Sequence, residues 1–397
     1  MRTVLPTSKD HDKVAAIRRE MPAVQKWVFL NTGSNGPLPS CAHMAMLQQA
    51  QIELVEGRVG MASYMRMAEV HQEAIACIAN ILGCKPEEVA LTHNTTEGMN
   101  IGLFGLNWQP GDEIVTAGSE HEGGLNPIAV IRERFGVKVR FTDIGLQGVD
   151  TLAELEKTLT PRTKAVMLSH VSWASGLVLP MREISDMAHA VGALVICDAA
   201  QGAGQVPSKV YDMGVDVYAL SGQKWLCGPD GTGAVFVRED RMDQILQTYV
   251  GYGAVTPRQA REGVEFTPRP GALRYQAISH STPAIRAFAT GMSWIDCDLG
   301  WEWVYQRIRE LGRYCYDTLA ALPGVQMYMP SYDGLAGLIH FTVDGIAPAD
   351  LTEKLGQRGI SIRHTPDPVL NRASTGFYNT EEDIDRLAEA ITELQVS

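Results

Sequence analysis

The residues ALVICDAAQ, at positions 193–201, run from an almost wholly apolar segment into a carboxylate and an amide. Such a run is typical of a central strand in a parallel sheet that is covered on both faces. Comparable short runs, rich in β-forming residues, lie on either side of it, and stretches of helical length and apolar spacing separate them. The expected strands are 88–94, 113–120, 137–144, 164–172, 193–201 and 216–222, and the expected helices between them are 95–106, 124–135, 151–159 and 181–191. This alternation predicts an α/β fold with a mostly parallel sheet.

A Gly- and Pro-rich stretch at 251–271 interrupts the alternation, because its prolines cannot donate to a strand ladder. Beyond it the sequence predicts a long helical region at 282–322, a strand at 337–343, a helix at 348–358, a short strand at 360–363 and a last helix from Glu381. We therefore expect an N-terminal segment (1–20), a large domain (21–285) and a smaller C-terminal domain (286–397) on which the N-terminal segment packs.

Charge and composition argue against several classes of partner. The chain has 34 basic and 46 acidic residues, a net charge of -12, which disfavours nucleic acid and anionic membranes. No apolar run approaches the roughly 20 residues of a membrane span, and the N-terminus lacks a signal-peptide core, so we expect a cytoplasmic protein. The seven cysteines are scattered and the ten histidines show no metal-binding spacing. We therefore expect reduced cysteines and no catalytic metal.

Clusters of polar residues follow four of the predicted strands. They are HNTTEG at 93–98, SEHEG at 119–123, DAAQ at 198–201 and SGQKW at 221–225. Ligands of open α/β sheets bind at the carboxyl ends of the strands. The four clusters therefore predict a single site at one edge of the sheet.

Residues in three of these clusters suit different parts of a cofactor, but each also has an ordinary explanation. Thr95 and Thr96 open a predicted helix and so suit a phosphate, or they simply cap that helix. Asp198 is delivered from a buried strand and needs a partner such as a protonated pyridine nitrogen, unless it caps a helix or forms an ion pair. Lys224 lies in a mostly apolar, Gly-rich stretch, where a desolvated amine suits Schiff-base chemistry, although most lysines are surface residues.

With these motifs in place, the chain resembles the class V group of fold-type I pyridoxal 5'-phosphate (PLP) enzymes. That group includes cysteine desulfurases, cyst(e)ine lyases, isopenicillin N epimerase and kynureninase. The resemblance covers about residues 29–394 and rests on two motifs that are specific together, 198–201 and 221–225. It implies the PLP-dependent transferase fold type I: a large domain with a mostly parallel mixed sheet flanked by helices, plus a smaller C-terminal α+β domain, with PLP as cofactor.

The resemblance also implies cofactor contacts residue by residue. Lys224 would form the Schiff base, Asp198 would pair with the pyridine nitrogen, and His121 would stack on the ring. From the local sequence alone, an ordinary loop histidine is an equally good interpretation of His121. The remaining implied contacts are Thr95, Thr96 and Ser221 to the phosphate and Gln201 to the ring hydroxyl. Gln223 stands where many relatives have histidine, and its amide can still donate to the phosphate.

Further implied residues concern the neighbouring subunit and the substrate. Ser279 ends a segment, 274–279, that resembles the family segment reaching the phosphate of the other subunit, so a homodimer is implied. Arg372 matches the family arginine that grips the substrate carboxylate. Arg363 would assist it or form a surface ion pair. Asn31 resembles a family position near the same carboxylate, or is a turn residue.

Desulfurases of this group carry a nucleophilic cysteine on a loop of the C-terminal domain, whereas no cysteine follows Cys315 here. The segments around Trp173 and 363–372 look most like those of the cyst(e)ine lyases, in which Trp173 would line the substrate side of the pocket or pack in the core. We therefore predict PLP-dependent β-elimination of a sulfur group from cysteine, cystine or a related amino acid, giving pyruvate, ammonia and a thiol or persulfide.

Alternatives stay open within and outside this chemistry. Within the family they are a lyase acting on a bulkier sulfur conjugate, an epimerase, an aminotransferase, and a desulfurase without a persulfide cysteine of its own. Outside catalysis, a PLP-binding or sulfur-relay protein without activity is the remaining alternative.

Overall fold

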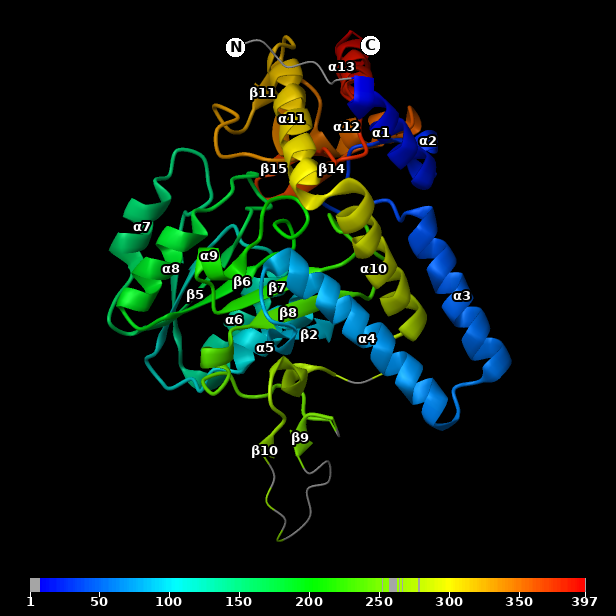
Figure 1. The fold of residues 1–397 in the computed structure, drawn as a ribbon. Helices are drawn as coiled ribbons and strands as arrows, with labels where there is room; N and C mark the ends of the chain where they lie inside the picture. The colour runs from blue at the N-terminus through cyan, green and yellow to red at the C-terminus, as the bar shows by residue number, and fades with distance from the viewer. Residues whose placement is uncertain are drawn as a thin grey trace.

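A mixed sheet lies at the centre of the larger domain in the computed structural model (Figure 1), which describes residues 8–396 except 252, 257–262, 264, 266 and 278. Within these residues it has seven strands in the order β2-β8-β7-β6-β5-β3-β4. The strands are β2 (Val89–Thr92), β3 (Glu113–Ala117), β4 (Lys138–Thr142), β5 (Thr163–Ser169), β6 (Leu194–Asp198), β7 (Val217–Ser221) and β8 (Gly233–Val237). β8 runs antiparallel to both of its neighbours, and the other pairs are parallel. The predicted α/β fold with a mostly parallel mixed sheet is confirmed.

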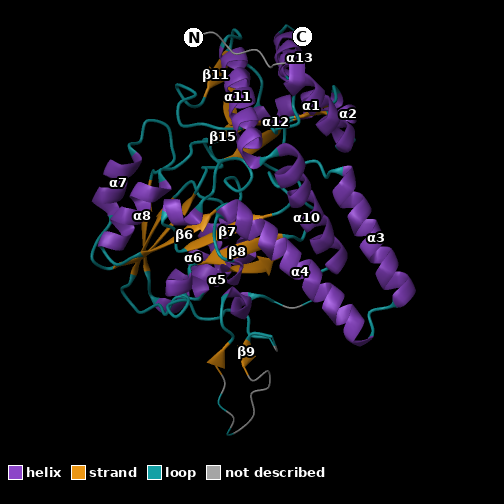
Figure 2. Cartoon of the chain, in the orientation of Figure 1, coloured by secondary structure: helices purple, strands orange, loops and turns teal. Residues whose placement is uncertain are grey.

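Helices cover both faces of this sheet (Figure 2). They are α4 (Gly60–Leu82), α5 (Thr95–Phe104), α6 (Glu122–Phe135), α7 (Thr151–Thr158), α8 (Met181–Ala190), α9 (Val210–Met213) and α10 (Thr282–Trp294). Side chains of β6 alternate between the two cores, with Val195 and Cys197 packed against α4 and α8, and Leu194 and Ile196 packed against α5. Because both faces are buried, β6 is apolar at every position before Asp198.

A long helical hairpin that the sequence analysis left unassigned extends from the larger domain (Figure 1). It consists of α3 (Ser40–Glu56) and α4, and α10 packs against both helices. The predicted domain boundary at 285/286 falls inside α10, whose Phe288 and Met292 belong to the core of the large sheet.

The smaller domain is built on an antiparallel sheet with the strand order β11-β12-β15-β14. Its elements are α11 (Trp301–Ala320), β11 (Val325–Met327), β12 (Leu338–Val343), α12 (Pro348–Gln357), β14 (Arg363–Pro366), β15 (Val369–Ser374) and α13 (Glu381–Gln395). The N-terminal part of the chain joins it, because β1 (Val28–Phe29) pairs with β13 (Ile360–Ser361). The remaining elements are α1 (Ser8–Glu20), α2 (Ala23–Lys26), β9 (Val255–Thr256), β10 (Thr267–Pro268), the 3-10 helices η1 (Pro86–Glu88), η2 (Glu239–Arg241) and η3 (Ala272–Tyr275), and the π-helix η4 (Ile295–Leu299).

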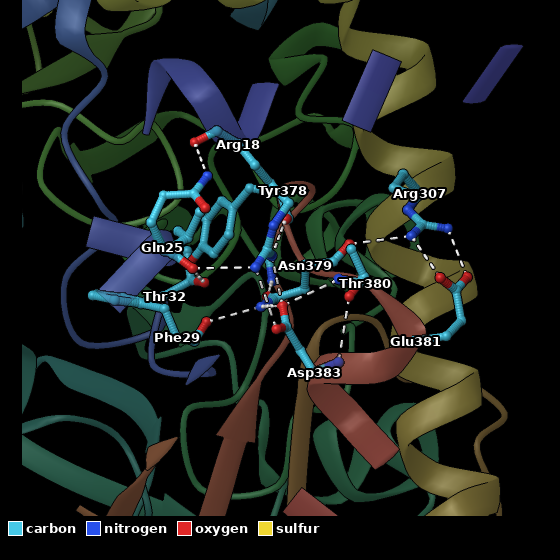
Figure 3. A network of polar contacts seen from close by, with 12 residues as sticks. Arg18, Gln25, Phe29, Thr32, Arg307, Tyr378, Asn379, Thr380, Glu381 and Asp383 are labelled. Carbon is cyan, nitrogen blue, oxygen red and sulfur yellow. Dashed lines mark hydrogen bonds and ion pairs between the residues drawn. The ribbon is translucent and has the colours of Figure 1, made fainter. Parts of the chain in front are cut away.

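A polar network fixes α1 on the smaller domain (Figure 3). Arg18 donates to the Asp383 carboxylate (2.8 Å) and to the carbonyl oxygens of Tyr378 (3.0 Å) and Val24 (3.1 Å). Asp383 is buried and also accepts from Asn379 Nδ2 at 3.0 Å. Residues 8–20 of the predicted N-terminal segment thus lie against the C-terminal domain, while its residues 1–7 are outside the described part of the chain.

Candidate active site

A cavity of about 240 Å³ opens beside the carboxyl ends of β2, β3, β6 and β7, where the four polar clusters of the sequence meet. Its lining residues are Gly33, Ser34, Asn94, Thr95, Thr96, His121, Trp173, Asp198, Ala200, Gln201, Ser221, Gln223, Lys224, Arg363 and Arg372. Eleven of the thirteen residues predicted for the site are among them. The parallel strands bring these residues together because their carboxyl ends share one edge of the sheet.

Lys224 is the amine of this cavity, and its surroundings lower its proton affinity. Burial lowers the pKa of Lys224 to about 8, Asp198 opposes that shift, and the positive charges of Arg372 and Arg363 add to it. A lysine with this pKa is partly neutral near pH 8 and is therefore a competent nucleophile and proton acceptor.

Two carboxyl groups lie near the carboxyl ends of β3 and β6, which are separated in the sheet by β5. Asp198 ends β6, is buried, and accepts one hydrogen bond from the backbone N–H of Ala200 at 2.8 Å. Glu120 is also buried and accepts from the Ser169 backbone N–H at 2.8 Å and from the Ser169 hydroxyl, while Ser169 pairs with Asp198 across β5 and β6. Burial raises the pKa of Glu120 to about 7, and Asp198 adds to this rise. Among the described residues Asp198 has no cationic partner within an ion-pair distance, which leaves it available to a cationic ligand.

Unpartnered polar atoms test whether the cavity fits a phosphate-bearing cofactor. Thr95 Oγ1, Ser221 Oγ and Gln223 Oε1 are buried and have no hydrogen-bond partner. Asn94 does cap α5, because its side chain accepts from the Glu97 backbone N–H at 2.9 Å, but the Thr95 hydroxyl has no part in that cap. A phosphate beside these hydroxyls and the N-terminus of α5 would satisfy the Thr95 and Ser221 groups, so the residues fit the cofactor.

Aromatic and amide side chains also line the cavity. The ring of His121 meets Trp173 edge to face, with centroids 5.5 Å apart, and Trp173 Nε1 donates to the Ser119 carbonyl at 2.8 Å. Burial lowers the pKa of His121, and Lys224 lowers it further. Gln201 donates to the Gly33 carbonyl at 2.9 Å and accepts from Trp225 Nε1 at 2.8 Å, and these two bonds fix its amide in the cavity lining.

Two arginines reach the cavity from the smaller domain. Arg372 on β15 is buried, its Nε has no hydrogen-bond partner, and burial together with Arg363 lowers its pKa to about 9. Arg363 on β14 lies directly opposite it in the strand register. Both donate to the Ser34 hydroxyl, and neither forms an ion pair with a carboxylate among the described residues. A buried guanidinium without an acid predicts an anionic ligand.

Two predicted residues lie outside the cavity lining in the single chain. Asn31 bridges to Ser374 through the backbone, and its buried Oδ1 has no hydrogen-bond partner. Ser279 is exposed, with a positive φ of 74°. Sequence reasoning missed Gly33 and Ser34, for which only the turn composition of TGSNG at 32–36 gave a signal. No group of His, Cys, Asp and Glu side chains in the described part of the chain is arranged to hold a metal ion.

A lysine, a buried carboxylate and unpartnered hydroxyls at one sheet edge define a fold-type I PLP enzyme, and comparison with known proteins supplies the family. The model of the class-V aminotransferases matches residues 37–387, so the chain belongs to that family. Its cofactor is PLP, as predicted.

Individual proteins that are similar to the chain have names that refer to cysteine or cystine. A cysteine desulfurase of Haloferax volcanii is 31% identical over 340 residues, which cover 81% of this chain and 78% of that protein. A structure of the cystine C–S lyase C-DES with its product cysteine persulfide is 29% identical, has a TM-score of 0.89 and covers 94% of this chain and 99% of that one. A C-DES variant with glycine covalently linked to its PLP cofactor is 28% identical, with a TM-score of 0.90, and covers 95% of this chain and 99% of that one.

In the described part of the chain, no helix combines the length and the apolar character that crossing a bilayer requires.

Proposed function

We propose that the chain is a PLP-dependent carbon–sulfur lyase that eliminates the β-sulfur group of cystine, cysteine or a related amino acid. The observation that carries this proposal is the meeting of Lys224, Asp198 and Arg372 around one cavity, where Arg372 has no acidic partner among the described residues. The sulfur chemistry agrees with the names of the relatives, which are a cysteine desulfurase and a cystine C–S lyase.

Each residue has a distinct task in this reaction. Bound PLP would supply a covalent attachment for Lys224 and an electron sink for the α-carbon of the substrate. Asp198 would hold the protonated pyridine nitrogen, and Thr95 with Ser221 would donate to the phosphate. Arg372 would orient the substrate carboxylate.

The elimination itself is a proton transfer followed by loss of sulfur. Lys224 Nζ takes the α-proton, and its pKa near 8 suits a base that must also give the proton back. The β-sulfur then leaves with the electron pair of the Cβ–S bond. The three-carbon remainder is hydrolysed to pyruvate and ammonia, and the sulfur leaves as a thiol or, from cystine, as cysteine persulfide.

A second candidate is cysteine desulfurase activity with an external sulfur acceptor, because the curated relative is named a cysteine desulfurase. The sequence from 316 to 397 offers no thiol to accept sulfur, so this activity would need a thiol or partner protein in solution.

Product analysis separates the two reactions. Purified holoprotein is incubated with L-cystine and with L-cysteine, and pyruvate and alanine are quantified together. The proposal expects pyruvate with ammonia in equal amounts and no alanine; alanine without pyruvate would establish desulfurase chemistry instead. Lys224→Ala is expected to abolish product, whereas Lys85→Ala, which removes an exposed lysine paired with Glu239, is expected to leave turnover unchanged.

We further infer a homodimer in which Ser279 contributes to the cofactor site of the neighbouring subunit. Ser279 is exposed and absent from the cavity of its own chain, as such a role requires. The α3–α4 hairpin supports the dimer, because it exposes a series of large apolar side chains: Met44, Leu47, Leu54, Val55, Val59, Met61, Tyr64 and Met65. A surface of this composition favours protein association. The cytoplasmic location expected from the sequence stays a prediction.

A further inference from the structure

The hydroxyl of Ser34 lies between the two arginines of the cavity. It accepts from Arg372 Nη2 at 3.2 Å and from Arg363 Nη1 at 3.3 Å. The two guanidinium groups come from opposite positions on β14 and β15, so they reach the cavity side by side. Two like charges therefore share a single neutral oxygen at the cavity wall.

The loop that carries Ser34 is fixed from both domains. Gln201 donates to the Gly33 carbonyl at 2.9 Å, the Ser34 backbone N–H donates to Asn31 at 2.9 Å, and the Gly36 backbone N–H donates to the Gln223 carbonyl at 2.7 Å. A Cβ on Gly33 would lie 3.2 Å from Arg372 Nη2 and 2.8 Å from Leu338. Because the loop is hydrogen-bonded and closely packed at Gly33, it holds the Ser34 hydroxyl in place.

The Ser34 hydroxyl can still donate one hydrogen bond. A serine hydroxyl accepts two hydrogen bonds and donates one. Both acceptor positions of Ser34 are taken by cations, and no acceptor for its proton is found among the hydrogen bonds of the described residues. Two charge-assisted bonds to the oxygen polarise the O–H group and make it a stronger donor. Ser34 lines the cavity and contacts Arg372 directly, so an anion held by Arg372 would lie close to that proton.

We propose that Ser34 is a third binding residue for the substrate carboxylate, donating its hydroxyl proton to the group that Arg372 and Arg363 hold. This inference rests on the proposed function, since it assumes an amino-acid substrate. It adds a neutral donor to the two cations. One carboxylate would then be bound by three side chains from two domains.

Binding without turnover tests this assignment. Holoprotein is titrated with glycine and with methylamine, which share an amine but differ in the carboxylate, and the absorbance of the bound cofactor reports each affinity. We expect Ser34→Ala to weaken glycine about tenfold, the loss typical of one hydrogen bond to a charged group. Methylamine affinity should change less than about twofold. Ser34→Thr keeps the hydroxyl and should retain glycine affinity within about threefold.

Two controls keep the result specific. Asn35→Ala alters an exposed side chain in the same turn and is expected to leave both affinities unchanged. In an Arg363→Ala background, a direct bond from Ser34 predicts that Ser34→Ala still weakens glycine about tenfold. Loss of the effect in that background would show that Ser34 merely places Arg363 and would overturn the proposal, as would an equal loss for methylamine. Because glycine has no β-sulfur, this titration reports on Ser34 even if cystine yields no pyruvate.

Discussion

Burial sets the chemistry of the individual charged residues in this site. Lys224, Glu120 and Arg372 all have shifted pKa values, and in each case desolvation is the largest cause. The shift moves Lys224 and Glu120 toward neutral forms near physiological pH, whereas Arg372, with a pKa of about 9, keeps its charge. A single cavity thus holds an amine that is partly neutral near pH 8 beside a guanidinium that keeps its positive charge.

The pKa of Lys224 predicts how cofactor capture depends on pH. Only the neutral amine attacks an aldehyde, and lowering the pH below the pKa protonates it. We expect the rate at which apoprotein acquires the absorbance of covalently bound PLP to level off above about pH 9 and to fall about tenfold for each unit below the pKa of about 8. Stopped-flow absorbance from pH 6 to 9.5 measures this profile. A rate that still rises about tenfold per unit up to pH 9.5 would show that Lys224 behaves as a solvated lysine.

The unpartnered hydroxyls predict a loss of cofactor affinity without a loss of stability. Thr95→Val and Ser221→Ala remove buried hydroxyls that have no hydrogen-bond partner in the protein, so the apoprotein should unfold at an unchanged or higher temperature. PLP should bind each variant about tenfold more weakly. Equilibrium dialysis and calorimetry measure the two effects. Ser185→Ala is the matched control, because Ser185 Oγ is equally buried and unpartnered but lies outside the cavity.

The predictability of the site residues follows from their place in the chain. Asp198 ends β6 and Lys224 lies three residues beyond β7, so the apolar strands marked both positions, and the family resemblance gave them their predicted roles. Ser34 contacts Arg363 and Arg372, which lie 329 and 338 residues away in the sequence. This contact depends on how the two domains pack against each other. The turn composition of 32–36 is typical of a loop but carries no information about that distant contact.

At the scale of elements, strands with an apolar pattern were predicted and β15 was not. β15 is buried along most of its length, yet it includes Asn371, Arg372 and Ser374. These polar residues break the apolar pattern that identifies a buried strand. The hairpin of α3 and α4 was missed for a related reason, since its exposed apolar residues blur the amphipathic period that marks a helix.

The junction between α1 and α13 predicts where stability depends on one carboxylate. Asp383 accepts from Arg18 and Asn379 and caps α13 together with Thr380. Asp383→Ala leaves these donors unpaired and is expected to lower the free energy of unfolding by about 2–3 kcal/mol. Urea unfolding provides the measurement. Glu389→Ala, at an exposed position of the same helix, should change it by less than about 0.5 kcal/mol, and equal effects of the two substitutions would contradict the role of the network.

At the scale of the whole molecule, the two domains and their loops each complete a part of the cavity. The large sheet supplies Lys224, Asp198 and the unpartnered hydroxyls of the cavity, the smaller domain supplies both arginines, and the N-terminal loop at 31–36 joins them. Neither domain holds the full set of side chains. The exposed hairpin and Ser279 are the features from which we infer a dimer of the chain. Each copy has a net charge of -12, so two copies repel one another, and an apolar contact surface is the more effective route to association.

Placing charge on the α3–α4 hairpin tests the inferred dimer. Leu54 and Val55 are 79% and 72% exposed, and in a dimer that buries them Leu54→Asp with Val55→Asp would bring two carboxylates into an apolar interface. Light scattering should then report a mass near 43.4 kDa in place of about twice that value. Val396→Asp, at a residue 87% exposed near the C-terminus, should leave the mass unchanged.

If Ser279 serves the neighbouring subunit, the dissociated variant should lose PLP on dilution, and Ser279→Ala should weaken PLP binding while the protein stays dimeric. A parent protein that is monomeric, or a monomeric variant that keeps full PLP affinity, would refute the shared site.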